Sequence, residues 1–166
     1  MDCRRQCIEL MNVLDLLPFV RGWGYEPTTL SNQTIKETTR VIDWNNKKGW
    51  FLWMAGSMND PNVIIRIVTD QYYGKSITPL ALYAGGLTTS NNTGVWVAKY
   101  DAVNSIYSPV YAPPYPLPFN SAIKIELTPS SNGPFTLINY GNLLITITDE
   151  ETFLKDLRRV LGKGLK

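Results

Sequence analysis

The chain contains no histidine, and charged residues make up only 18% of its 166 residues. Without an imidazole it lacks the commonest general base and metal ligand at neutral pH, and it cannot form a Ser-His-Asp or Cys-His arrangement. The net charge of +2 gives no strong nucleic-acid signal, because binding to phosphates requires clustered lysine and arginine. We therefore expect a protein that is not an enzyme and carries no cofactor.

Cysteine is equally scarce, with Cys3 and Cys7 only four residues apart. On a helix their side chains would share a face at a Cα separation of about 6 Å, poorly aimed for a disulfide. A metal site would need two further soft ligands that the chain does not offer. Free thiols and no metal are the expectation.

Long hydrophobic runs are also missing. Glu9 and Asp15 interrupt the first twenty residues, and no stretch approaches the eighteen apolar residues of a spanning helix. We expect neither a signal peptide nor a transmembrane segment. The basic residues near the C-terminus, from Lys155 to Lys166, either complement the dipole of a helix or contact a membrane or nucleic acid.

Asn, Ser, Thr, Tyr and Gly take the place of the missing charge, a composition that favours strands and turns. Apolar residues alternate clearly in one segment, where Ile123, Ile125 and Leu127 face away from Lys124 and Glu126. The predicted strands are 35–43, 48–56, 62–70, 78–84, 94–100, 104–111, 121–128, 134–139 and 142–148, with a hairpin turn at 140–142. This spacing predicts a mainly β, antiparallel β-sandwich of jelly-roll-like type over 35–148.

A helix is predicted at each end of the chain. The first covers 2–17, with apolar side chains at Cys3, Cys7, Leu10, Leu14 and Leu17. That seam packs either on its own subunit or on another copy or partner. A connecting arm over 18–34 follows, so that 1–34 form the N-terminal unit. The second helix, 149–161, would lie on or beside the sandwich within 149–166, capped by Thr148 and ended by Gly162.

Five prolines between 109 and 118 predict a stiff, extended segment outside any central sheet position. It is either a crossover between sheets or a contact with another subunit. Together with the seam of the first helix it supplies the candidate subunit-contact residues Leu10, Leu14, Leu17, Tyr111, Pro113 and Tyr115.

Aromatic residues are the other conspicuous feature, since flat rings serve both glycan binding and protein interfaces. Trp44, Trp50, Tyr72 and Tyr73 are candidate ligand-binding rings, whereas Phe51, Trp53 and Trp96 are expected in the core. The carboxylates of the strand region show no spacing that singles out a catalytic pair; they are Asp43, Asp60, Asp70, Asp101 and Glu126.

The run Pro118–Leu127, followed by a polar break and the segment Phe135–Thr148, resembles the closing strands of small β-sandwich structural proteins of viral and phage particles. A helical arm ahead of a sandwich is similar to that group as well. The resemblance implies a structural protein of a virus-like or phage-like assembly, in contact with copies of itself or other particle proteins. It implies location in a particle; otherwise the chain is expected to be soluble and cytoplasmic. The alternative is a carbohydrate-binding module that uses exposed aromatics.

Overall fold

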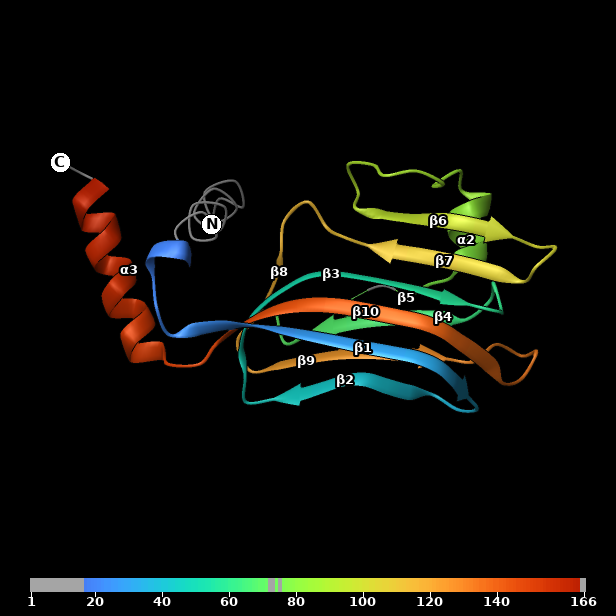
Figure 1. The fold of residues 1–166 in the computed structure, drawn as a ribbon, viewed down its shortest axis with the longest axis horizontal. Coiled ribbons are helices and arrows are strands. Elements are labelled where there is room, and N and C mark those ends of the chain that lie inside the picture. Colours follow the sequence, from blue (N-terminus) through green and yellow to red (C-terminus); the bar gives the residue numbers. More distant parts are fainter. Residues whose placement is uncertain (1–16, 72–73, 75, 165–166) are drawn as a thin grey trace.

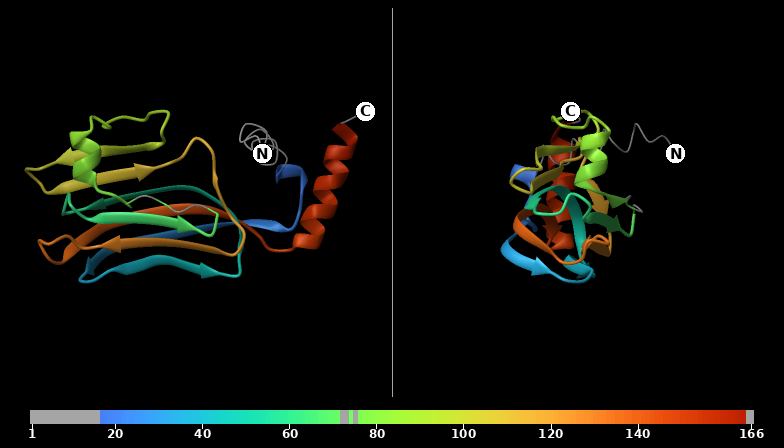
Figure 2. Two further views of the ribbon diagram at one scale, coloured as in Figure 1. Left: turned by 180° about the vertical axis from the view of Figure 1, so that it is seen from behind. Right: turned by 90° about the vertical axis from the view of Figure 1, so that its right-hand side faces the viewer.

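A computed structural model of the chain describes residues 17–71, 74 and 76–164. The helix expected at 2–17 falls outside this range, except that Leu17 begins a short 3-10 turn, η1 (Leu17–Phe19). The described residues form two antiparallel sheets that face each other, with one helix standing beyond their end (Figures 1 and 2).

The larger sheet has six strands and the smaller has four. The larger contains β1 (Trp23–Ile35), β3 (Lys48–Met58), β6 (Val95–Asp101), β7 (Ile106–Tyr111), β8 (Leu117–Phe119) and β10 (Phe135–Ile147). The smaller contains β2 (Thr39–Asn45), β4 (Ile64–Thr69), β5 (Ser76–Ile77) and β9 (Ala122–Thr128). The helices are α2 (Pro79–Ala84) and α3 (Glu150–Gly164).

Strand pairing is nested along the chain: β1 pairs with β10, and β2 pairs with β9. The strand orders are β1-β10-β3-β7-β6, with β8 also on β3, and β2-β9-β4-β5. Such rolled pairing of early with late strands is the connectivity of a jelly roll. The predicted mainly β, antiparallel sandwich is confirmed.

The core lies between the two sheets. It consists of the alternate residues along each strand whose side chains point inward. Phe51, Met54 and Met58 from β3 meet Ile65 and Ile67 from β4. The alternation read in the sequence at 123–127 is confirmed, because Ile123, Ile125 and Leu127 are fully buried.

Two of the sequence assignments around β1 and β10 are wrong. The expected arm at 18–34 is largely the 13-residue edge strand β1, which tolerates Pro27 because it pairs with β10 alone among the described strands. The expected turn at 140–142 is the middle of β10, where Gly141 pairs with Thr29 and Ala55 on either side.

The segment 78–84 is a helix rather than a strand, because Thr78 caps it and Pro79 occupies its first turn. Helix α3 is confirmed, but its cap is Asp149, which accepts from the Thr152 amide at 3.0 Å, rather than Thr148. The helix also continues through Gly162.

The prediction that the proline-rich segment lies outside any central sheet position is wrong for Pro109. Pro109 lies in β7, between β6 and β3, and Pro118 in β8 pairs with Trp50. The β6–β7 pairing is irregular next to Pro109, with a register shift between Val97 and Lys99. A local break in the ladder reduces the cost of a missing amide donor.

Candidate functional site

The outward side of the six-stranded sheet carries two uncharged rows that cross its strands. The first runs through Pro27, Leu143 and Trp53, which are register partners on β1, β10 and β3. The second crosses all five strands of the main path and consists of Thr29, Gly141, Ala55, Val110 and Trp96. We call these residues, with Tyr25, the outer apolar face.

The outer apolar face is accessible to solvent. Tyr25 is 59% exposed and Trp53 is 39% exposed, whereas Leu143, Val110 and Trp96 are half-buried. The Trp53 ring lies against Gly141, where a Cβ atom would meet two of its carbons at 3.7 Å. Trp53, expected in the core, is therefore on the outside, because the extra residue of a bulge at Leu52–Trp53 shifts its side.

Near Ile145, the outward side of the six-stranded sheet is covered by η1 and α3. Ile145 of β10 pairs with Tyr25 and Trp50. It is buried together with Leu17 of η1, Val20 just after η1, and Phe153 of α3. We call this group the terminal cluster. Trp50 and Leu52 pack against it, and the Trp50 and Phe153 rings lie 6.3 Å apart. No element that the structure describes covers the face beyond the terminal cluster.

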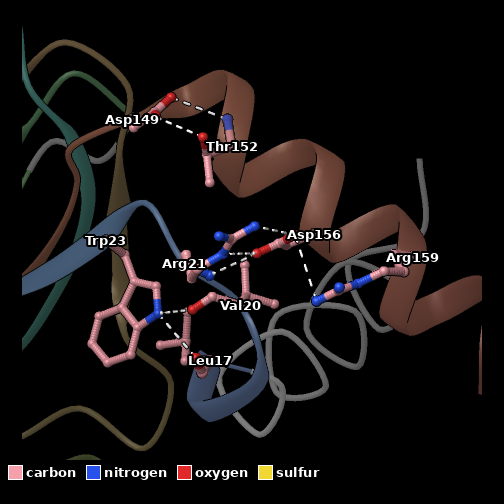
Figure 3. A network of polar contacts seen from close by, with 8 residues as sticks. All are labelled: Leu17, Val20, Arg21, Trp23, Asp149, Thr152, Asp156 and Arg159. Carbon is pink, nitrogen blue, oxygen red and sulfur yellow. Dashed lines mark hydrogen bonds and ion pairs between the residues drawn. The ribbon is translucent and has the colours of Figure 1, made fainter.

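An ion pair fastens α3 to the start of β1 (Figure 3). The Arg21 Nε donates to Asp156 Oδ2 at 2.8 Å, and the Arg21 amide reaches the same oxygen at 3.3 Å. Arg159 adds a contact at 3.5 Å from its own helix. The Trp23 indole donates to the carbonyls of Leu17 and Val20 at 2.9 and 2.7 Å, which fixes η1 beside the helix.

The charge on Asp156 is favoured by this arrangement. The side-chain hydrogen bond from Arg21 is the largest influence and lowers the pKa of Asp156 below its ordinary value, although burial acts in the opposite direction. The Asp156 side chain is only 3% exposed, whereas that of Arg21 is 75% exposed. The pair therefore anchors the helix at a nearly buried carboxylate.

The predicted subunit-contact residues fall in different places. Leu17 is enclosed in the terminal cluster at 4% exposure, and Leu10 and Leu14 lie outside the described residues. Tyr111 points between the sheets, with its ring 5.8 Å from that of Phe51. Pro113 is half-buried and Tyr115 is 47% exposed.

The predicted ligand-binding rings do not form one row among the described residues. Trp44 belongs to β2 in the smaller sheet and packs on the main core, with the Lys47 ammonium 4.2 Å from its ring centre. Trp50 belongs to β3 in the larger sheet and packs on the terminal cluster. Tyr72 and Tyr73 lie outside the described residues. Phe51 is fully buried as expected, and Trp96 is half-buried.

The strand-region carboxylates make structural contacts. Asp43 and Glu126 both bind Arg40, at 2.9 and 3.0 Å. Asp60 accepts from Ser130 and from the Asn62 amide. Among the described residues, no group of three or more acidic, cysteine or histidine side chains could hold a metal ion.

Two further carboxylates close turns. Asp70 accepts from the Asn120 amide at 2.9 Å; burial raises its pKa, but hydrogen bonds from Gln71 and the amides of 120–122 outweigh this and bring the pKa to about 2. Asp101 binds the amide and side chain of Asn104, and those bonds lower its pKa.

Sequence reasoning missed most of the outer apolar face. The sequence signals predict an arm at Tyr25 and Pro27 and a turn at Gly141. Leu143 showed the expected alternation, but nothing in the sequence tells which side of a sheet meets the opposite sheet. A continuous reading of 135–147 as one strand would have placed Gly141, Leu143 and Ile145 on one side.

Comparison with known proteins gives distant structural matches alone: no protein-family model and no curated protein matches the chain. The VP2 subviral particle of infectious bursal disease virus matches with a TM-score of 0.39 and 11% identity, covering 82% of this chain and 35% of that one. The infectious bursal disease virus Gx strain gives 0.37 and 10%, covering 81% and 34%. A serine protease of Aeromonas sobria gives 0.32 and 10%, covering 80% and 29%.

This chain thus spans about a third of the length of the structures it matches. The resemblance to proteins of viral particles is weak in three dimensions, as it is in sequence. None of the described helices has both the length and the apolar character needed to cross a membrane.

Proposed function

We propose that this chain is a non-enzymatic structural protein whose copies associate with one another or with other proteins of a particle. The observation that carries the proposal is the outer apolar face, which no described element covers. A sandwich normally directs polar residues outward from its sheets. A contiguous exposed apolar patch of about 300 Å² or more is often a functional contact surface.

The face offers a better contact than the edge of the same sheet. The edge strand β1 carries Pro27, which has no amide donor, and Asn32, which has a positive φ of 51° and no partner in the otherwise continuous ladder with β10. Both features oppose the addition of another strand. Association is therefore expected through side chains of the face rather than through backbone pairing.

The size of the face indicates that other contacts contribute. Five strands about 4.8 Å apart and about four residues along each strand give a flat area of roughly 300 Å². A stable interface usually buries about 800 Å² on each partner. We assign the remainder to the N-terminal segment that contains Leu10 and Leu14 and to the proline-rich loop at Tyr115.

The roles of the carboxylates support the non-enzymatic part of the proposal. Asp43, Asp70 and Glu126 are each engaged by arginine or by backbone amides. A glycosidase-type pair needs two carboxyl groups that flank a substrate bond. An acid that closes a turn or binds an arginine is better explained by stability.

Carbohydrate binding through exposed aromatics is the alternative function. The observation that favours it is the Trp53 ring, which lies against Gly141 and is 39% exposed. It predicts binding on a glycan array that is lost in Trp53→Ala. An array on which the wild-type protein binds nothing contradicts it.

Light scattering of the full chain over a concentration series tests the structural proposal. We expect the average mass to rise above that of one chain with concentration, and Trp53→Glu to suppress the rise. Leu80→Glu is the matched control, since Leu80 is 40% exposed but lies on α2, away from the face. A monomer at every concentration, or equal behaviour of the two variants, contradicts the proposal.

A further inference from the structure

A cavity of about 520 Å³ lies between the two sheets, on the opposite side of the larger sheet from the outer apolar face. It occurs where α2 and the β6–β7 pair stand over β4 and β5 (Figure 1). Its wall includes Ile65 and Ile67 from β4, Ile77 from β5, Leu82 from α2, Val95 from β6 and Tyr111 from β7. The volume is within the usual range for small-molecule sites.

Six of the nine described lining residues carry aliphatic side chains, and the other three are Gly74, Thr93 and Tyr111. Ile65, Ile67 and Leu82 are themselves buried and belong to regular elements, so the fold fixes this part of the wall. The cavity is not sealed, because Val95 and Ile77 are half-buried and Thr93 at its rim is exposed. No charged side chain is among the described residues that line it.

We propose that this cavity binds a neutral, mainly aliphatic small molecule with one hydrogen-bonding end, of the class of medium-chain alcohols. Aliphatic walls favour the transfer of a hydrocarbon chain out of water. A carboxylate or ammonium would lose its hydration without gaining a partner of opposite charge among the described lining residues, so a charged end is disfavoured. The rim hydroxyl of Thr93, which is hydrogen-bonded to Asn91, is placed to meet a neutral polar end.

The proposal does not depend on association between copies. The outer apolar face and the cavity use different residues, and the cavity faces the smaller sheet. A monomeric protein could bind the ligand, and a self-associating protein could lack the ligand. The two proposals therefore succeed or fail separately.

Displacement of a neutral fluorescent probe, N-phenyl-1-naphthylamine, from the full chain tests the inference. We expect saturable uptake and competition by hexanol, octanol and decanol, with affinity rising about fourfold for each added methylene. Decanoate should compete at least tenfold more weakly than decanol at neutral pH. Absence of saturable uptake, no dependence on chain length, or equal competition by decanoate overturns the proposal.

Two tryptophan substitutions then locate the probe. Val95→Trp fills the cavity and should reduce uptake at least tenfold, whereas Val103→Trp should leave uptake unchanged, since Val103 is 93% exposed on a turn. Trp53→Glu should also retain uptake, which excludes the outer apolar face as the binding site. Equal uptake by folded Val95→Trp and Val103→Trp overturns the assignment, and the competition series on the wild-type chain decides the matter if Val95→Trp does not fold.

Discussion

Single residues of the six-stranded sheet are constrained most where two backbones approach closely. At Gly49 in β3, an added Cβ would lie 1.8 Å from the Ile145 carbonyl oxygen and 3.0 Å from the Thr146 Cα. Ile145 belongs both to β10 and to the terminal cluster. Gly49 therefore lies where the sandwich contacts the cluster that holds α3.

Gly49→Ala should destabilise the fold by about 3 kcal/mol or more, because the backbone of β10 must move to admit the methyl group. Gly24→Ala is the control, since its nearest contact would be the Thr148 methyl at 4.0 Å. Denaturant unfolding measures both free energies. The account of this contact is wrong if the two substitutions cost the same.

At the scale of elements, helix α3 depends on a small set of contacts. Phe153 belongs to the terminal cluster, Leu157 packs against it, and Asp156 binds Arg21 (Figure 3). Because the Asp156 carboxyl has a lower pKa in the folded chain than in the unfolded chain, its ionisation stabilises the docked helix. That contribution is complete above about pH 4 and is lost as the pH falls through the lowered pKa.

Asp156→Asn should loosen α3 at neutral pH. Trypsin should then cleave after Lys155, Arg158 or Arg159 faster than in the wild-type chain. Asp101→Asn, at the end of β6 and far from α3 in the sequence, should leave this cleavage unchanged. In thermal unfolding, Asp156→Asn should have the lower Tm at pH 7, and its difference from the wild type should shrink below about pH 4. An undiminished difference in acid argues against a role for the carboxylate charge.

The sequence predicted elements best where one side of a strand faces the core. The segment 121–128 alternates without interruption, and the predicted strand differs from β9 (Ala122–Thr128) only by beginning one residue earlier. Prediction failed where tertiary pairing overrides local signals. Pro27 is tolerated on an edge strand, and Gly141 accommodates the ring of Trp53, so neither breaks its strand. Thr78-Pro79 is a local signal for the start of a helix, and it is this signal rather than the apolar content of 78–84 that decides the structure.

The functional surface was less predictable than the fold for a physical reason. Burial of one strand side follows from alternation, but coverage of the other side depends on elements distant in sequence. Leu17 and Phe153 cover Ile145, while Leu143, two residues earlier on the same side, is half-buried. That difference between neighbours cannot be obtained from periodicity.

At the scale of the whole molecule, the two sides of the larger sheet have different roles. The inner side closes the core and borders the cavity below α2. The outer side is shielded at one end by the terminal cluster and carries the outer apolar face over the rest. We infer that the shielded end holds η1 and α3 against the sheet, while the uncovered part is the surface proposed to contact a neighbour.

Hydroxyl-radical footprinting of the full chain, dilute and concentrated, tests the central claim most directly. We expect oxidation of Tyr25 and Trp53 to fall severalfold in the concentrated, associated sample. Oxidation of Tyr83, which is 49% exposed on α2, should stay the same in both samples. Association with unchanged oxidation of Tyr25 and Trp53 would contradict the account.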